Sequence, residues 1–213
     1  MDLRVPEVSD HIVAAIRARL IDRVGPFVVA LDGGSGVGKS TLAAAVATEL
    51  GASVVHTDDF FASHRTGAEW DACTAAEKAD LAIDWQRLRA QALEPLRASR
   101  AASWHPFDFA TYDYASGSGL ATAFVTCQPT RVIVMDGIYS CRPELSDLTD
   151  LSVLVEARAA VRRQRHDERE ATDEAAWHSR WDKAEAYYFA HIRRRASFDL
   201  VVSTDLASEL GQE

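Results

Sequence analysis

The chain has 213 residues, of which 47% are hydrophobic and 26% charged, as in an ordinary globular domain with a sizeable core. Its net charge of −9 argues against a nucleic-acid surface, because phosphate backbones attract basic footprints. No apolar run reaches membrane-spanning length, residues 1–6 lack a signal-peptide pattern, and the three cysteines lack C-x-x-C spacing. We therefore expect a cytoplasmic protein without nucleic-acid or membrane partners; its oligomeric state is left open, a homo-oligomer included.

Apolar periodicity predicts strands that alternate with helices. The expected core strands cover 27–31, 53–56, 131–136, 151–155 and 198–202. The expected helices cover 9–23 (capped by Ser9 or Asp10), 41–50 (stopped by Gly51), 84–97 (with the last turn kinked or shortened by Pro95), 157–169 and about 173–195. This alternation predicts a single α/β domain over 1–213, with a parallel, doubly wound sheet and a site at the carboxyl ends of its strands.

Two further segments interrupt the alternation. Residues 62–83 are polar and mixed, which favours a flap or a short helix. Residues 103–107 and 122–127 are expected to pair as a hairpin around the loop 108–120. We assign the acceptor flap and hairpin to about 60–127, and a helical lid to about 158–195.

A glycine-rich motif, G-x-x-x-x-G-K-S, lies between the first predicted strand and the helix that follows it. Its residues are Gly33, Gly34, Ser35, Gly36, Val37, Gly38, Lys39 and Ser40, followed by Thr41. A strand, a glycine turn and a helix start aim backbone N–H groups and the helix dipole at one point. The motif therefore predicts a phosphate-binding loop for a nucleotide, with Lys39 on the β- and γ-phosphates, and a glycine-rich turn without a ligand is the alternative.

An acid ends the third predicted core strand, directly before Gly137. Asp136 follows the apolar run 132–135, which is the position of an acid that holds Mg²⁺ in nucleotide-binding proteins. The Ser40 hydroxyl is the expected second protein ligand of Mg²⁺. A carboxylate that merely caps the turn at Gly137 is the alternative.

Two adjacent acids, Asp58 and Asp59, end the neighbouring strand. Phosphoryl transfer to a hydroxyl needs a carboxylate that accepts the hydroxyl proton and orients the oxygen. Adjacent strand residues point to opposite faces, so only one acid can face the substrate, and we favour Asp58. Solvated or capping carboxylates are the alternative.

Four arginines share one face of the predicted helix 157–169: Arg158, Arg162, Arg165 and Arg169. Like charges on one stripe repel, so an anionic ligand such as a triphosphate would explain them. A solvated face neutralised by nearby acids explains them equally well. We expect one or two of them to act, and we take Arg162 and Arg165 as catalytic and Arg169 as a substrate contact.

Aromatic residues gather in the segments around the predicted pocket. Phe60, Phe61, Phe107, Phe109, Tyr112 and Tyr114 follow the second strand or lie near the hairpin. They suggest an acceptor with a ring, with Phe61, Phe107 and Tyr112 in contact with it. Ordinary packing is the alternative for each of them.

Over about 26–204 the chain resembles the uridine kinase-like branch of P-loop kinases, which includes uridine kinase, phosphoribulokinase, pantothenate kinase and nicotinamide riboside kinase. Besides the glycine loop, four motifs carry the likeness: Asp58-Asp59-Phe60-Phe61, Pro106-Phe107-Asp108-Phe109, Met135-Asp136-Gly137-Ile138 and Arg162-Arg163-Gln164-Arg165-His166-Asp167. They are similar to the family's Asp-x-Phe-Tyr, Tyr-Asp-Phe, Glu-Gly-Ile and Arg-Arg-x-x-Arg-Asp.

The resemblance implies a three-layer P-loop fold whose five-stranded parallel sheet has the order 2-3-1-4-5, with helices on both faces. It also implies Asp58 as the base, Ser40 and Asp136 around Mg²⁺, lid arginines on the phosphates, and hairpin aromatics against a nucleoside base. Departures lie at Phe61 and Phe107, where tyrosines are usual, and at Tyr112, where a base-reading histidine is usual. His166 replaces a lid arginine, and Asp136 replaces a glutamate.

The first hypothesis is therefore an ATP- and Mg²⁺-dependent kinase that phosphorylates a hydroxyl of a small molecule, with a uridine- or cytidine-like nucleoside as leading acceptor. A sugar, a vitamin precursor or a secondary metabolite is the alternative acceptor. A nucleoside monophosphate kinase would need further cations, for which Arg65, Arg87 and Arg89 are the candidates. A nucleotide-dependent switch would need a motif such as N-K-x-D, which the sequence lacks.

Overall fold

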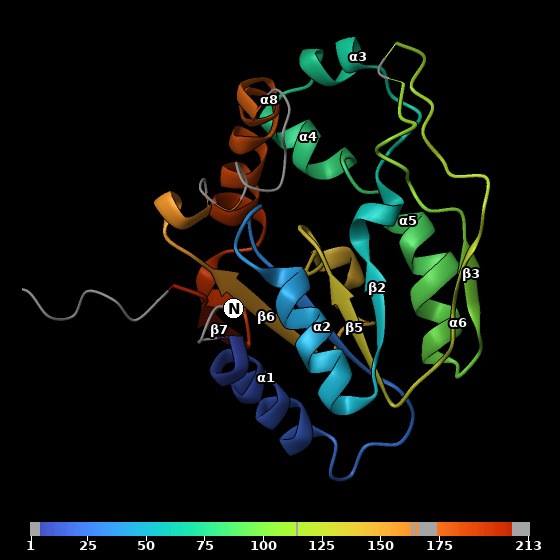
Figure 1. Ribbon diagram of the computed structural model, residues 1–213, viewed down its shortest axis with the longest axis vertical. Coiled ribbons are helices and arrows are strands. Elements are labelled where there is room, and N and C mark those ends of the chain that lie inside the picture. Colours follow the sequence, from blue (N-terminus) through green and yellow to red (C-terminus); the bar gives the residue numbers. More distant parts are fainter. Residues whose placement is uncertain (1–4, 114, 163–164, 166–173, 206–213) are drawn as a thin grey trace, which may run out of the picture.

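The computed structural model describes residues 5–113, 115–162, 165 and 174–205. Five parallel strands form the central sheet, in the order β2-β5-β1-β6-β7 (Figure 1). Their bounds are Phe27–Asp32 for β1, Ser53–His56 for β2, Val132–Asp136 for β5, Leu151–Glu156 for β6 and Leu200–Ser203 for β7. Counted along the chain these strands follow 2-3-1-4-5, so the predicted topology is confirmed.

Alternate residues of the strands feed two separate cores, one on each face of the sheet. On one face, Val29 and Leu31 of β1 pack with helices α1 (Val5–Arg19) and α2 (Lys39–Leu50). On the other face, Val28 and Ala30 pack with the helices of the flap and with α8 (Glu174–Tyr187). Each fully buried aliphatic side chain contributes about 1.5–3 kcal/mol, so these cores hold the strand ends in place.

The first helix differs from its predicted bounds. It begins at Val5 and ends at Arg19, so Ser9 and Asp10 lie within it and do not cap it. Ser9 instead donates its hydroxyl to the Pro6 carbonyl at 2.9 Å. Proline is tolerated in a first helical turn, where its missing N–H would have no partner, and this allows the earlier start. The predicted stop of the next helix is confirmed, because Gly51 adopts a left-handed φ of 60°.

The flap consists of short helices. Two of them, α3 (Gly67–Ala72) and α4 (Ala75–Leu81), each begin with a capping box, formed by Thr66 with Glu69 and by Thr74 with Glu77. A 3₁₀ turn, η1 (Thr57–Phe60), precedes them, and an antiparallel hairpin of β3 (Ala102–Trp104) and β4 (Val125–Cys127) follows. The hairpin lies outside the central sheet (Figure 1).

The predicted helix 84–97 is a helix with a π segment at its centre. It runs through α5 (Trp85–Leu88), the π segment η2 (Arg89–Leu93) and α6 (Glu94–Arg97), and Pro95 lies in the first turn of α6. The change in hydrogen-bond spacing gives the proline a place where a regular interior turn would have lost a bond. The structure thus has a π segment in the turn before Pro95.

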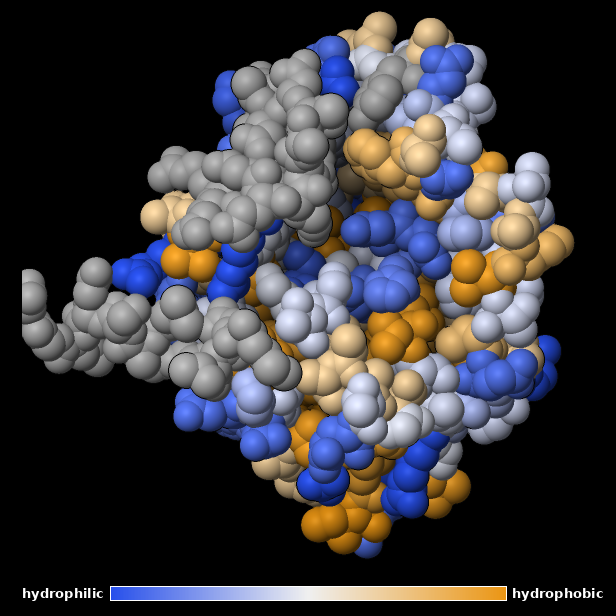
Figure 2. Space-filling model, in the orientation of Figure 1, coloured by the Kyte–Doolittle hydropathy of each residue, from blue (hydrophilic) through white to orange (hydrophobic). Residues whose placement is uncertain are grey.

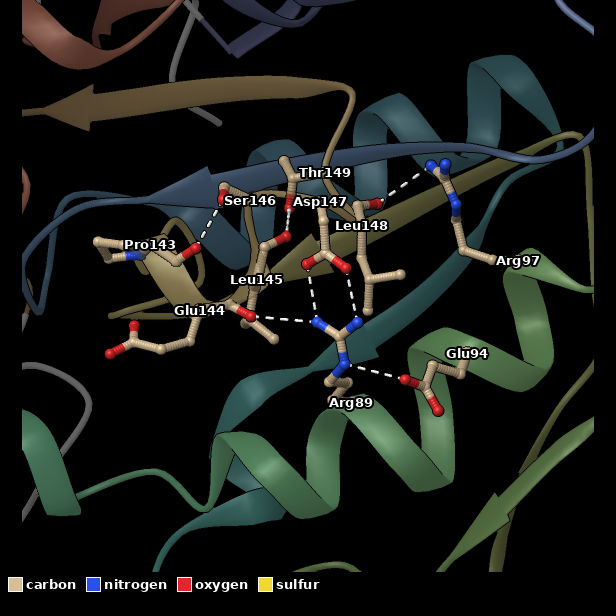
Figure 3. A network of polar contacts seen from close by, with 10 residues as sticks. All are labelled: Arg89, Glu94, Arg97, Pro143, Glu144, Leu145, Ser146, Asp147, Leu148 and Thr149. Carbon is tan, nitrogen blue, oxygen red and sulfur yellow. Dashed lines mark hydrogen bonds and ion pairs between the residues drawn. The ribbon is translucent and has the colours of Figure 1, made fainter.

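A polar network joins this helix to the segment after β5 (Figure 3). Arg89 donates to both carboxylate oxygens of Asp147 at 2.7 and 2.6 Å, and to Glu94 at 2.9 Å. Arg97 donates to the Leu148 carbonyl at 3.1 Å. These bonds attach the helix to the segment between β5 and β6. They also engage the Arg89 guanidinium away from the phosphate-binding loop.

The remaining helical turns lie after β5 and near the end of the described chain. They are the 3₁₀ turns η3 (Pro143–Leu145) and η5 (Arg195–Ser197) and the π segment η4 (Tyr188–Ile192), which extends α8. Of the predicted helix 157–169, residues 159–162 and 165 are helical, and 163–164 and 166–169 lie outside the described residues. None of the helices in the described part of the chain is long and apolar enough to cross a bilayer.

Candidate active site

The carboxyl ends of β1, β2 and β5 meet at one edge of the sheet. Asp136 at the end of β5 is in register with Leu31 on one side and with His56 on the other. A cavity of about 550 Å³ opens above this edge, and Figure 2 shows this face of the molecule hollowed near its centre. Its lining includes Ser35, Gly36, Gly38, Lys39, Ser40, Thr41, Asp58, Phe61, Phe107, Phe109, Gly137, Arg165, Trp181 and Glu185. Segments far apart in the sequence therefore share one cavity.

The phosphate-binding loop provides one end of the cavity. Lys39 begins α2 and donates its Nζ to the carbonyls of Gly33 at 2.8 Å and Gly34 at 2.9 Å. Gly36 has a φ of 76°, and a Cβ there would lie 2.6 Å from the Arg162 carbonyl oxygen, so a side chain does not fit. Val37 points into the core with 2% exposure, so its place in the loop is a packing one.

Asp58 and Asp59 diverge in the structure. They lie on the 3₁₀ turn η1 and not at the end of the strand. Asp58 is exposed and lines the cavity. Asp59 accepts from Trp104 Nε1 at 2.8 Å, and its carbonyl accepts from Arg87 Nη2 at 2.9 Å. The structure thus places Asp58 at the cavity, where a substrate could reach it, whereas Asp59 is bonded to Trp104 of the hairpin.

One carboxylate oxygen of Asp136 is hydrogen-bonded, and the other is not. Its Oδ2 lies 3.0 Å from His56 Nδ1, and this hydrogen bond raises the pKa of His56. Its Oδ1 is buried without a hydrogen-bond partner among the described residues. Since a buried polar atom is costly unless paired, this oxygen fits a Mg²⁺-bound water.

The donor set around Asp136 suits Mg²⁺ better than a metal held by protein alone. The described residues contain no group of three or more His, Cys, Asp or Glu side chains that could hold an ion. Mg²⁺ usually takes one or two protein ligands together with waters and substrate phosphates. Ser40, which lines the cavity, and Asp136 are the residues that would hold it.

The arginines of the predicted stripe that the structure describes make different contacts. Arg162 Nε donates to the Ser35 carbonyl at 2.8 Å, and Arg165 lines the cavity. Arg165 also donates to the Thr204 hydroxyl at 2.9 Å. Arg158 faces Asp205, to which its backbone N–H donates at 2.7 Å. Arg169 lies outside the described residues.

The far end of the cavity is aromatic. The ring centroids of Phe61 and Phe107 lie 4.8 Å apart, and those of Phe61 and Trp181 5.8 Å apart. Tyr112 packs edge-on against Phe61 and donates its hydroxyl to the Arg65 carbonyl, and it is not among the residues that line the cavity. The described structure thus places Phe61 and Phe107 at the cavity and Tyr112 behind them.

Two acids at the site are absent from the sequence prediction. Asp32 ends β1, is fully buried, and accepts from the backbone N–H groups of Gly33 and Tyr139 at 2.8 and 3.0 Å. Burial raises the pKa of Asp32, and hydrogen bonds from the Tyr188 hydroxyl at 2.7 Å and from the backbone N–H groups of Cys141 and Gly33 oppose that rise. Asp32 could have been predicted from the sequence, because it lies at the end of a strand directly before the loop, as Asp136 lies at the end of β5.

Glu185, the second such acid, lies on α8 with 6% exposure. Its carboxylate accepts from the Ser35 backbone N–H at 3.1 and 3.3 Å and from Arg162 Nη2 at 2.6 Å. Nothing in the charge pattern of residues 174–187 separates Glu185 from its charged neighbours, so the sequence offered no signal for it.

A family model described as "Phosphoribulokinase / Uridine kinase family" matches residues 28–174, well over half of the chain. The chain belongs to this family. Two curated relatives are named uridine kinase: one from Halobacterium salinarum, 26% identical over 150 residues, and one from Deinococcus deserti, 31% identical over 150 residues. The matches cover 69% and 65% of this chain but only 64% and 66% of the relatives' own lengths.

A solved structure supports the fold of this family member. The structure of a "possible uridine kinase" from Bacillus stearothermophilus superimposes with a TM-score of 0.66 at 22% identity, and covers 93% of this chain and 99% of that one. At this identity the likeness concerns the fold alone. It agrees with the three-layer architecture expected from the sequence.

Proposed function

We propose that the protein is a kinase that transfers the γ-phosphate of ATP to a hydroxyl of a small molecule, with a uridine- or cytidine-like nucleoside as the leading acceptor. The observation that carries the proposal is the shared cavity. Lys39 and Ser40 of the phosphate-binding loop line it together with Asp58, the one acid of its pair that faces inward. A donor end and a proton acceptor therefore open onto the same space.

Each part of this cavity has a role in the proposed reaction. ATP supplies the phosphoryl group, and Mg²⁺ held by Ser40 and Asp136 would neutralise charge on its phosphates. Asp58 accepts the proton of the acceptor hydroxyl and orients its oxygen. Lys39 and the loop N–H groups bind the phosphates. Arg165, which lines the cavity, and Arg162, which is not a lining residue but is held against the loop at Ser35, stabilise the charge of the transferring group. The aromatic end excludes water from the reacting atoms.

The cavity walls favour an uncharged acceptor with a ring. Among the described lining residues the cations are Lys39 and Arg165, and the opposite end consists of Phe61, Phe107, Phe109, Trp181 and aliphatic side chains. Flat apolar rings stack on such walls, whereas an anion would find no counter-charge there. A nucleoside meets this requirement better than a free sugar, which remains the alternative together with a vitamin precursor or a secondary metabolite.

A nucleoside monophosphate kinase is the less favoured candidate. Arg87 donates to the carbonyls of His105 and Asp59 at 2.9 Å each, and Arg89 is bound to Asp147. The Arg65 guanidinium lies over the ring of Trp70, 5.4 Å from its centroid. Two of the predicted cations for a second phosphate are thus bonded elsewhere, and none of the three is among the described residues that line the cavity. A nucleotide-dependent switch also lacks support, since the chain has no N-K-x-D motif.

The proposal extends to the setting of the enzyme. We place the elements of residues 1–213 in one kinase domain that acts in the cytoplasm on ATP and a small alcohol, without nucleic-acid or membrane partners. The net charge of −9 supports the absence of a nucleic-acid partner.

A screen of acceptors tests the proposed function. ADP release from ATP and Mg²⁺ is measured with nucleosides, sugars, pantothenate-like alcohols and nucleoside monophosphates. We expect the highest kcat/KM for an uncharged nucleoside, and loss of transfer in Lys39→Ala. Preference for a monophosphate, or full activity in Lys39→Ala, would contradict the proposal.

A further inference from the structure

Glu185 has contacts that the proposed roles above do not use. It is buried at the donor end of the cavity, on a helix that is far in sequence from the phosphate-binding loop. Both of its carboxylate oxygens face the Ser35 backbone N–H, and Oε2 also accepts from Arg162 Nη2 at 2.6 Å. A charge-assisted bond of this length is among the stronger polar contacts in a protein.

Arg162 and Glu185 together hold the peptide of Ser35 from both sides. Arg162 Nε donates to the Ser35 carbonyl at 2.8 Å, while Glu185 accepts from the Ser35 N–H. The pair also lies against Gly34, where a Cβ would be 2.5 Å from Arg162 Nη2 and 2.7 Å from Glu185 Oε2. The loop is therefore shaped around this ion pair, and only a glycine leaves room for it.

We propose that Glu185 is a positioning residue for phosphoryl transfer: through its ion pair with Arg162 it fixes the guanidinium against the phosphate-binding loop. This inference rests on the proposed function, because it assigns the held arginine to the transferring phosphoryl group. Glu185 itself touches neither the acceptor nor the reacting oxygen in this scheme.

The physical reason lies in the arginine side chain. Arg162 is about one-third exposed (34%), and a long side chain at such a position has many rotamers. A buried carboxylate at 2.6 Å selects one of them, so the donors are in place before the reaction begins. Charge stabilisation depends on donors that need no rearrangement during transfer.

A double-mutant cycle tests the role of Glu185. Glu185→Gln keeps the shape and an oxygen for the Ser35 N–H, but it removes the ion pair with Arg162. We expect kcat to fall roughly 10- to 100-fold, with the KM for ATP changed by less than about threefold. In an Arg162→Ala background the same substitution should change kcat by less than about twofold, because the group through which Glu185 acts is already gone.

The chain offers a chemically matched control. Glu49→Gln breaks an ion pair between Glu49 and Arg17 of 2.7 Å, but both side chains are more than half exposed and far from the cavity lining. We expect this variant to keep wild-type kcat and KM. Equal losses in Glu49→Gln and Glu185→Gln would overturn the assignment, since a general charge effect would then explain both.

Two other results would overturn it. One is a loss of kcat in Glu185→Gln that is as large without Arg162 as with it. The other is a lowered melting temperature and a raised KM for ATP with kcat unchanged, which is the signature of a purely structural brace.

Failure of the proposed function can be told apart from failure of this inference. A wild-type protein that phosphorylates no alcohol contradicts the proposed function, and the cycle is then measured on ATP hydrolysis by water, where the same non-additivity is expected. Hydrogen exchange of the Ser35 amide needs no substrate. Glu185→Ala should accelerate it in the nucleotide-free protein, and unchanged exchange counts against the contact that the inference requires.

Discussion

The two ends of the cavity are built from different interactions. At the donor end, Lys39, Arg162 and Glu185 hold backbone atoms of the loop through hydrogen bonds of 2.8–3.3 Å. At the aromatic end, where the acceptor is proposed to bind, the Phe61 ring packs against those of Phe107 and Trp181, with centroids 4.8 and 5.8 Å away. Hydrogen bonds fix the direction of a group, whereas ring packing fixes only a shape.

The two ends of the cavity tolerate substitution to different degrees. At the loop end, directional hydrogen bonds keep their geometry only if the same atoms are present. An acceptor end made of apolar surfaces can be reshaped by substituting one ring for another, because packing tolerates swaps of similar volume. The departures from the family pattern at Phe61 and Phe107 lie at this second end.

The largest expected effect separates the two acids of η1. Asp58→Asn should lower kcat by about 10²- to 10⁴-fold, because the amide cannot accept the hydroxyl proton, while ATP affinity stays unchanged. Coupled ADP release and calorimetric ATP binding measure the two quantities. Asp59→Asn is the control, since an amide oxygen can still accept from Trp104 Nε1; an equal loss there would remove the distinction between the acids.

The stability of the fold at the start of the phosphate-binding loop should also depend on a buried carboxylate. Asp32→Asn presents an NH₂ group to donors such as the Cys141 backbone N–H, which lies 3.0 Å from Asp32 Oδ2. We expect the free energy of unfolding to fall by about 1–3 kcal/mol for each N–H left unpaired. Urea denaturation measures it. Tyr188→Phe removes a single donor and should cost less, so a larger cost in Tyr188→Phe would argue against Asp32 as the centre of these bonds.

At the acceptor end a smaller, substrate-dependent effect is expected. Phe107→Ala removes one wall and should raise the acceptor KM about tenfold, with the KM for ATP unchanged. Steady-state kinetics with both substrates varied show the separation. Phe124→Ala, a substitution of an exposed ring in the same loop region that does not line the cavity, is the control. An equal shift in the KM for ATP would mean that Phe107 acts on both ends of the cavity and not on the acceptor alone.

The smallest effect concerns Arg89, a candidate for binding a second phosphate. Since Arg89 is bound to Asp147 and Glu94 on the back of the flap (Figure 3), Arg89→Ala should leave kcat and both KM values within about twofold of wild type. A large rise in the acceptor KM would revive the monophosphate kinase alternative.

Local sequence patterns were sufficient to predict the strands of the sheet and the phosphate-binding loop. The glycine motif needs only neighbouring residues to form its turn, and the resemblance supplied the strand order that the structure confirms. Helix starts were less secure, since Pro6 allowed α1 to begin ahead of Ser9. The π segment also depends on local spacing around Pro95, but periodicity could indicate only a disturbance there.

Residues held by distant partners could not be predicted in the same way. The choice between Asp58 and Asp59 depends on Trp104, which is 45 residues away from Asp59. Glu185 meets Ser35 across 150 residues. Tyr112, expected at the substrate, is bound instead to the Arg65 carbonyl from behind the aromatic wall. Such contacts arise from the packing of the flap and α8, for which the sequence holds no local signal.

One helix serves both ends of the cavity. Trp181 and Glu185 are four residues apart on α8, so they lie on the same face, and both line the cavity. The helix is also attached to the flap, because Arg180 pairs with Asp71 at 2.7 Å and its carbonyl accepts from Lys78. A rigid displacement of α8 would therefore move Trp181, at the aromatic end of the cavity, together with Glu185, which holds Ser35 of the loop. We expect the affinities for nucleotide and acceptor to depend on each other, and by linkage each should change the other by the same factor.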